Sequence, residues 1–240
     1  MSVGLHKQRV LVVAAHPDDE MLGCGGTLAR LCAAGSHVSI LLLGEGPTAR
    51  EGSPTAHPAA SADAAGAARS EAAASARNAA ATLEIADVRL AALPDNRFDA
   101  VPLLDIVQLV EAVKRDARPD LILTHHAGDL NMDHAITHRA VMTAFRPLPG
   151  EPKTVILGFE VPSSTEYTSP SLAAPFQPVV YVDISDYLDA KQRALAAYAS
   201  EMRPWPHPRS HEGVEHLARL RGCQCGLTAA EAFALCRGVF

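Results

Sequence analysis

The sequence predicts an α/β fold of the Rossmann-like, three-layer type, in which helices cover both faces of a mostly parallel β-sheet. The first observation is that short apolar segments alternate with helical segments along most of the chain, as in βαβ units. The second is that two apolar segments end in clusters of His and Asp, as strands do at the ligand-binding edge of such sheets. The length of 240 residues fits one large domain, and no internal repeat or domain boundary is visible.

In the first two thirds, the expected strands are runs of branched aliphatic residues. The expected helices have apolar positions every three or four residues, or are rich in alanine, the strongest helix former. In chain order, we expect strands at 10–14, 37–43, 88–93 and 121–124, and helices at 25–34, 63–82, 101–117 and 133–145. The segment 44–62 between the second strand and second helix is rich in Gly, Pro, Ser and Thr, and its length indicates a functional loop.

The last third has a less regular pattern. We expect strands at 153–159 and 179–182, a helix at 185–199, a loop dense in Pro, Arg and His at 202–210, and a final pair of helices at 212–221 and 228–237.

Composition excludes several classes of partner. The net charge of −6 and the lack of a basic stripe argue against nucleic acid. No apolar run approaches the length of a membrane span, and no signal peptide is evident. Five cysteines without framework spacing indicate reduced thiols. We therefore expect a cytoplasmic protein without a nucleic-acid or membrane partner. The sequence leaves open whether it forms a homo-oligomer.

The most informative run is Ala15–Glu20 (AHPDDE), which directly follows the first expected strand. His16 and Asp19 are three residues apart, a spacing that lets two side chains bind one ion. Asp18, beside one of these candidate ligands, is expected to point elsewhere and to take a proton from water activated by the metal. This arrangement indicates metal-assisted hydrolysis.

A second polar cluster, 125–134, follows the fourth expected strand. If the first and fourth strands lie close together, His134 completes a His-Asp-His set with His16 and Asp19. Three protein ligands and one open position are typical of catalytic zinc; iron, cobalt and manganese remain alternatives. His138 is spaced from His134 as in HExxH zinc proteases, but Ala135 stands where their glutamate would be. We therefore expect His138 on the helix surface or beside a ligand.

These motifs resemble those of the PIG-L/LmbE-like family of zinc-dependent N-deacetylases. The family's first motif, (A/P)HPDD(E), corresponds to Ala15–Glu20, and its second, H-x-D-H, corresponds to Asn131–His134. Weaker features of the family stand at 44–50, 69–71 and 93–96, so that the resemblance covers at least 10–146. The segment 201–210 resembles a C-terminal stretch of one bacterial branch.

The resemblance implies an LmbE-like fold, His16, Asp19 and His134 as ligands of one Zn²⁺, Asp18 as general base and Asp133 as an orienting residue. Asn131 departs from the family, whose members often carry a histidine there that stabilises the oxyanion or protonates the leaving amine. An asparagine can donate a hydrogen bond to the oxyanion but cannot act as an acid. Proton delivery is therefore left open among Asp18, His126 and His207.

The implied function is removal of the acetyl group from an N-acetylated amino sugar or its conjugate, a small-molecule substrate. One domain, 1–240, is expected, with 150–240 completing the substrate site. Candidate substrate-binding residues are Arg50, Arg97, His126, Arg203, His207 and Arg209. One alternative is hydrolysis of another acyl-amide, such as a thiol conjugate or an antibiotic intermediate. The other is a non-catalytic nucleotide- or metal-binding module, but the glycines at 23–26 lack the GxGxxG spacing.

Overall fold

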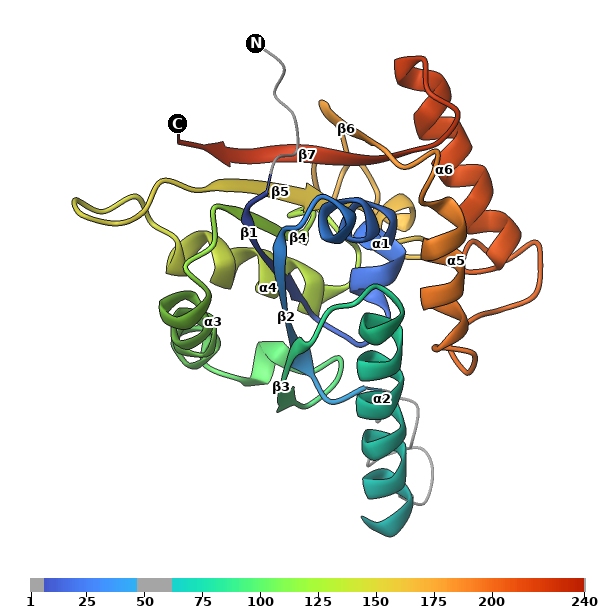
Figure 1. Cartoon of the computed structure of the whole chain (residues 1–240). Coiled ribbons are helices and arrows are strands. Elements are labelled where there is room, and N and C mark those ends of the chain that lie inside the picture. Colours follow the sequence, from blue (N-terminus) through green and yellow to red (C-terminus); the bar gives the residue numbers. More distant parts are fainter. Residues whose placement is uncertain (1–6, 47–61, 240) are drawn as a thin grey trace.

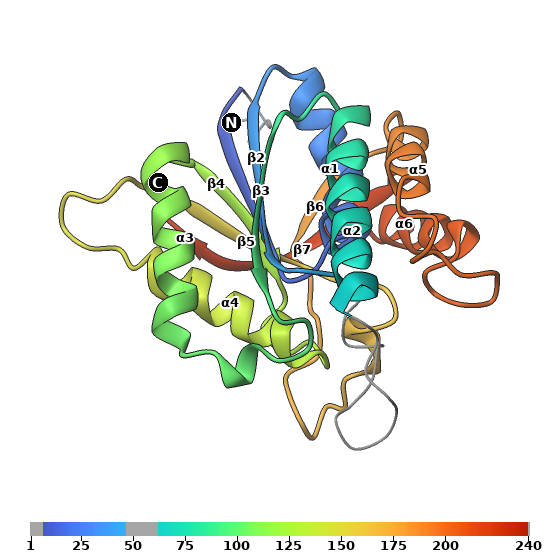
Figure 2. The same ribbon diagram turned by 90° about the horizontal axis from the view of Figure 1, so that it is seen from below.

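A computed structural model describes residues 7–46 and 62–239 of the chain. Seven strands form one sheet in the order β3-β2-β1-β4-β5-β7-β6, with helices on both faces (Figures 1 and 2). The strands are β1 (Arg9–Ala14), β2 (His37–Gly44), β3 (Asp87–Leu93), β4 (Leu121–His125), β5 (Val155–Phe159), β6 (Val180–Asp183) and β7 (Ala230–Gly238). The helices are α1 (Asp19–Ala33), α2 (Ala62–Thr82), α3 (Leu103–Ala117), α4 (Met132–Ala144), α5 (Leu188–Ala196) and α6 (His211–Cys225), with short 3₁₀ turns η2 (Phe98–Ala100) and η3 (Thr165–Tyr167).

The first five strands are parallel, and β7 runs antiparallel between β5 and β6. The predicted α/β fold with a mostly parallel sheet is confirmed. Alternate residues of β1 face two apolar cores: Val10 and Val12 pack with α1, α2, α5 and α6, whereas Leu11 and Val13 pack with α3 and α4. Because both faces of the central strands are covered, these strands consist mostly of apolar residues.

Most of the segment 228–237 lies in strand β7 (Ala230–Gly238), so the prediction of a helix there was wrong. Its alanines favour a helix locally, but Ala230 and Ala232 are buried in a strand that pairs with both β5 and β6. Gly226, with a left-handed φ of 77°, ends α6 just before it. Tertiary pairing therefore overrides helix propensity in this segment.

Helix α1 starts at Asp19, six residues before the expected start at 25, and is broken at Cys24, where φ is −146°. A buried ion pair lies at the break, with Lys191 Nζ 2.6 Å from Glu231 Oε1. Glu231 of β7 accepts hydrogen bonds from the backbone N–H groups of Gly26 and Thr27, and Lys191 of α5 donates to the Leu22 carbonyl. The break in α1, shortly after the AHPDDE motif, is thus held by residues from the C-terminal part of the chain.

Strand β1 lies between β2 and β4, so the chain leaves it toward one edge of the sheet and later returns to its other side. This reversal opens a crevice at the carboxyl ends of β1 and β4, where α/β sheets bind ligands.

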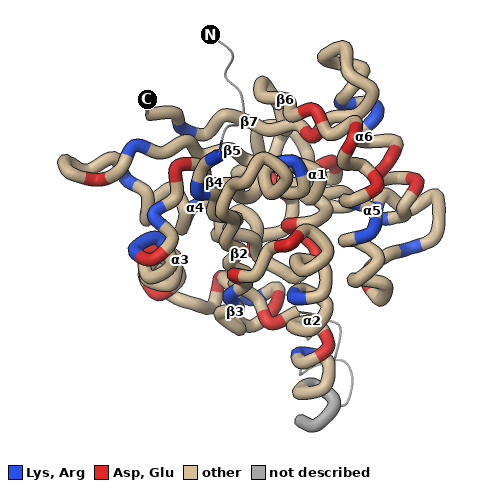
Figure 3. Tube along the Cα trace, viewed as in Figure 1, with Lys and Arg blue, Asp and Glu red and all other residues tan. Residues whose placement is uncertain are grey.

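Other sequence expectations concern the surface and the thiols. Among the described residues, no helix is long and apolar enough to cross a membrane. Along the same residues, Lys and Arg are distributed over several elements and lie among Asp and Glu (Figure 3). All five cysteines are free thiols.

Candidate metal centre and active site

Three of the predicted site residues meet at the carboxyl ends of β1 and β4. His16 follows β1, Asp19 begins α1, and His134 lies in the first turn of α4. The Oδ2 atom of Asp19 lies 3.3 Å from His16 Nδ1 and 3.2 Å from His134 Nε2. Together, the three side chains form a compact group of potential metal ligands.

The geometry of this group fits a divalent ion. In a tetrahedral site with bonds of about 2.0–2.1 Å, neighbouring ligand atoms lie about 3.3 Å apart. The distances from Asp19 to the two histidines are close to this value. Asp19 Oδ1 and His134 Nε2 are also buried without a hydrogen-bond partner. Buried polar atoms are rarely left in this state, and an ion bound beside Asp19 Oδ2 would give His134 Nε2 a partner.

Further carboxylates contact the second nitrogen of each histidine ring, the one that does not face Asp19. His16 Nε2 lies 3.0 Å from Asp133 Oδ2 and 2.8 Å from Asp95 Oδ1. His134 Nδ1 lies 3.1 Å from Asp129, which also accepts hydrogen bonds from the hydroxyls of Ser164 and Thr165. Such partners fix the ring orientation and increase the basicity of the nitrogen that binds metal.

The pKa values of the group follow from its packed charges. Burial lowers the pKa of His134, but Asp19 and Asp129 outweigh it and raise that pKa to about 9. Burial also opposes the charged form of His16, whose pKa is nevertheless raised by Asp133 and Asp19. Both rings therefore attract protons before metal binds, and a metal ion must displace these protons.

Asp18 is adjacent to Asp19 but faces a different part of the site. Its Oδ2 atom lies 2.8 Å from Arg209 Nη1, and the same guanidinium donates to Ser163 Oγ. Burial raises the pKa of Asp18 to about 7, with Arg209 acting in the opposite direction and Asp19 adding to the rise. A buried carboxyl of this kind, close to a group of potential metal ligands, is suited to accepting and returning a proton.

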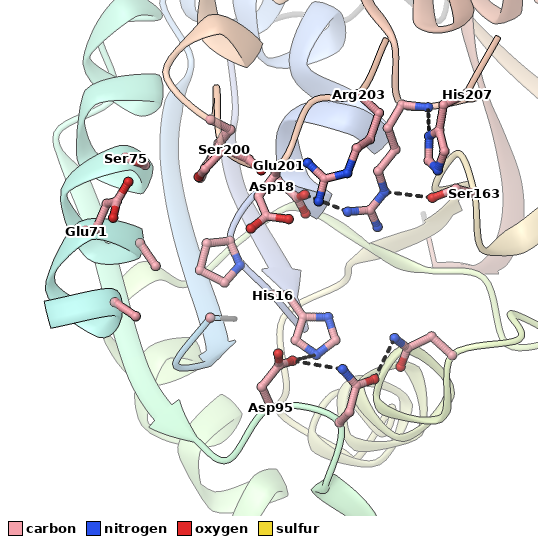
Figure 4. Close-up of a pocket in the computed structure, with 18 residues that line it drawn as sticks. His16, Asp18, Glu71, Ser75, Asp95, Ser163, Ser200, Glu201, Arg203 and His207 are labelled. Atoms are coloured by element: carbon pink, nitrogen blue, oxygen red, sulfur yellow. Dashed lines mark hydrogen bonds and ion pairs between the residues drawn. The ribbon is translucent and has the colours of Figure 1, made fainter. Parts of the chain in front are cut away.

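The cluster opens into a cavity of about 520 Å³ (Figure 4). Glu71 and Ser75 of α2 stand on one side of it, across from Arg203 and His207. The residues that line it are His16, Pro17, Asp18, Gly46, Ala68, Glu71, Ala72, Ser75, Asp95, Asn96, Asn131, Ser163, Tyr198, Ser200, Glu201, Arg203, His207 and Arg209. The wall is rich in hydrogen-bonding and charged groups, which suits a polar ligand.

The structure brings only some of the predicted substrate-binding residues to this cavity. Arg203, His207 and Arg209 line it. Arg97 is exposed before η2, and the His126 ring lies against the Ala174 carbonyl, 3.1 Å from Nε2 to the oxygen; neither residue lines the cavity. Arg50 lies outside the described residues.

Asn131 lines the cavity and also caps α4. Its Oδ1 atom accepts a hydrogen bond from the Asp133 N–H at 2.9 Å, and its Nδ2 donates to Asn96 Oδ1 at 3.1 Å. One amide hydrogen remains available to a ligand.

We expect Asn131→Ala to lower the free energy of unfolding by about 1 kcal/mol, because the cap is lost, and to lower kcat by up to about 10²–10³-fold, because an oxyanion donor is lost. Asn131→Asp keeps the capping oxygen but has no amide hydrogen, and so separates the two effects. Chemical denaturation and steady-state kinetics measure them. Wild-type kcat in Asn131→Asp would reduce Asn131 to a helix cap.

Five polar residues whose role the sequence did not indicate belong to the site. Asp95 and Asp129 follow β3 and β4, so their positions at strand ends were the available signal. Glu20 was part of the motif, and its buried carboxyl accepts a hydrogen bond from Tyr198. No sequence signal pointed to Tyr198, which follows α5. His125 is buried, and its Nε2 accepts from the Ala15 N–H at 2.8 Å.

Comparisons with known proteins identify relatives of this chain. The family model of PIG-L, described as GlcNAc-PI de-N-acetylase, matches residues 11–145. The uncharacterized deacetylase YaiS of Escherichia coli is 27% identical over 81% of this chain and 92% of its own length. A 1D-myo-inositol 2-acetamido-2-deoxy-α-D-glucopyranoside deacetylase of Saccharopolyspora erythraea is 28% identical over 82% of this chain and 78% of its own. The crystal structure of the conserved protein TT1542 from Thermus thermophilus matches with a TM-score of 0.71 and 28% identity, covering 97% of this chain and 96% of the other.

The fold, the site and these matches define a hydrolytic N-deacetylase. The chain belongs to the PIG-L family, because the family model covers more than half of it. The resemblance inferred from the two motifs is therefore confirmed.

Proposed function

We propose that this protein is a zinc-dependent N-deacetylase that hydrolyses the acetamide of an N-acetylated amino-sugar conjugate. One observation carries the proposal. The His-Asp-His cluster contains buried potential ligand atoms that have no hydrogen-bond partner. Beside it lies the carboxylate of Asp18, which is not part of the cluster and faces the same polar cavity. A metal-assisted hydrolase needs these two components, a ligand set with an open position and a separate base.

Zinc is the ion we propose, because two imidazole nitrogens and one carboxylate oxygen form a ligand set that it commonly takes. When bound, it would supply Lewis-acid polarisation of the acetyl carbonyl and activation of water. Asp133 and Asp129 keep His16 and His134 oriented for that ion.

Asp18 carries out both proton transfers of the reaction. Asp18 takes a proton from the attacking water as the water oxygen adds to the acetyl carbon. The amide C–N bond breaks, protonated Asp18 returns its proton to the amine nitrogen, and the acetyl group leaves as acetic acid, which releases its remaining proton to solvent to give acetate. Arg209 holds the Asp18 carboxylate in place, and the remaining Asn131 N–H donates to the developing oxyanion. No other acid is required, which suits a site with an asparagine at position 131.

The cavity supports the substrate class. From His16 it extends toward Glu71 and Ser75 of α2 and toward Ser200 and Arg203. This wall offers donors and acceptors for sugar hydroxyls. The relative from Saccharopolyspora is named for an inositol-linked N-acetylated sugar, so we propose that the sugar is joined to a second polar group that occupies the outer part of the cavity. The free thiols support the cytoplasmic location that we propose.

The test is acetate release by metal-free and zinc-loaded protein from a panel of substrates. The panel contains N-acetylglucosamine, its inositol and malate conjugates, N,N'-diacetylchitobiose, an N-acetylated thiol conjugate and an acylated glycopeptide antibiotic. We expect zinc-dependent release from at least one sugar conjugate. Release from the thiol conjugate alone would favour the acyl-amide alternative. Absence of release from every compound would contradict the proposal.

A further inference from the structure

The C-terminal part of the chain, beyond the matched residues 11–145, contacts the AHPDDE turn through a pair of buried side chains. The Tyr198 hydroxyl donates to Glu20 Oε1 at 2.5 Å. The other oxygen of the same carboxylate, Glu20 Oε2, accepts a hydrogen bond from the backbone N–H of Asp18 at 3.1 Å. Glu20 is 1% exposed and Tyr198 is 2% exposed, so water cannot replace either contact.

The backbone that these contacts support is unusual. Asp18 has a φ of 104°, a region that residues with a Cβ atom rarely adopt. Such a conformation persists only where the surroundings hold it. The Asp18 carbonyl accepts hydrogen bonds from the N–H groups of Met21 and Leu22 in α1. On the other side of the residue, its N–H is held by Glu20.

This conformation separates two adjacent carboxylates. Asp19 points into the cluster with His16 and His134, whereas Asp18 points to Arg209 and the cavity. A relaxed backbone at Asp18 would change the direction of its carboxylate relative to the open metal position. Among the described residues, the hydrogen bonds of the Glu20 and Tyr198 side chains go to each other and to Asp18, and none goes to the three cluster residues.

We propose that Glu20 and Tyr198 are positioning residues, which hold Asp18 in its catalytic direction through the hydrogen bond from its N–H to Glu20. This inference rests on the proposed function, because it assumes that Asp18 is the base. It assigns a role in the reaction to the last residue of the first motif and to a tyrosine outside the matched part of the chain.

Three variants test the proposal. Tyr198→Phe removes the donor that orients Glu20, and Glu20→Met removes the acceptor at similar volume. Glu20→Gln can still accept from the Asp18 N–H through its amide oxygen and can donate to the Tyr198 hydroxyl. We expect the first two to lower kcat per metal-loaded molecule by about 10–100-fold, the effect of a small misplacement of a catalytic group, with little change in KM or metal content. Glu20→Gln should largely restore kcat. Tyr187→Phe, which removes the hydroxyl of another tyrosine at the start of α5, is the control and should leave kcat unchanged.

A double variant separates positioning from general damage to the fold. In an Asp18→Asn background, Tyr198→Phe should cause no further loss of kcat, because residues that act through one another are not additive. Equal losses in both backgrounds, or unchanged kcat in Tyr198→Phe, would overturn the proposal.

Amide hydrogen exchange provides a readout that needs no substrate. In the metal-loaded wild type, the Asp18 N–H should exchange slowly, and in Tyr198→Phe and Glu20→Met it should exchange faster while the N–H groups of the central strands remain protected. Unchanged exchange at Asp18 would overturn the inference. If the wild type releases no acetate from any substrate, the proposed function fails, whereas the exchange rates still decide whether Glu20 and Tyr198 hold Asp18.

Discussion

His134→Ala should bind zinc at least about 100-fold more weakly than the wild type and lose its turnover accordingly. Replacing an orienting partner of a ligand typically costs 10–100-fold in metal affinity or activity, and removing the ligand itself should cost no less. In this protein the loss also leaves Asp19 with one imidazole in place of two at 3.2–3.3 Å. Elemental analysis of the purified variant and competition with a chelator measure the affinity.

The same helix provides a matched control for this variant. His138 lies one turn beyond His134 on α4, and its Nδ1 bonds to the His125 carbonyl at 2.9 Å and not to the cluster. His138→Ala should therefore retain one zinc ion per chain. Circular dichroism checks that both variants are folded. Full zinc retention in His134→Ala would remove this residue from the ligand set.

The sequence was sufficient to locate the candidate centre because of a topological rule. His16 and His134 are far apart in the chain, but each follows an apolar segment that was recognisable as a strand. Parallel strands place their carboxyl ends at one edge of the sheet, and β1 and β4 are direct neighbours. Residues in these two strand-end segments could therefore be assigned to one site. Asp95 and Asp129 obey the same rule, but single carboxylates in loops carry too weak a signal to be assigned a role.

The C-terminal part of the chain was harder to predict, because its structure depends on contacts distant in sequence. The alanines of β7 take their conformation from pairing with β5 and β6, and local propensity favoured a helix. Tyr198 contacts the first motif across 178 residues, and Glu231 contacts Gly26, in the helix that follows the motif, across 205 residues. No periodicity or spacing reports such a contact. What the motifs predicted was a set of ligands and a base, and what the structure adds is how these groups are held.

Asp18→Asn should lower kcat by about 10²–10⁴-fold, the contribution of a positioned general base, and should retain zinc. Asparagine has nearly the same shape as aspartate, and its oxygen can still accept the hydrogen bond from Arg209 that Asp18 Oδ2 accepts at 2.8 Å. The variant therefore changes the capacity to take a proton more than it changes the packing. Steady-state kinetics on a substrate identified by acetate release, normalised to zinc content, measure the effect.

The pH dependence of the two proteins should differ as well. Burial raises the pKa of Asp18 to about 7, and a bound cation lowers it, so the acidic limb of the wild-type profile should lie at or below pH 7. Turnover falls there as pH decreases, because a protonated carboxyl cannot accept another proton. Asp18→Asn should lack this limb, whereas Asp99→Asn, which changes an exposed carboxylate in η2, should keep both the wild-type kcat and the limb. Near-normal turnover in zinc-loaded Asp18→Asn would transfer the role of base to another residue of the cavity.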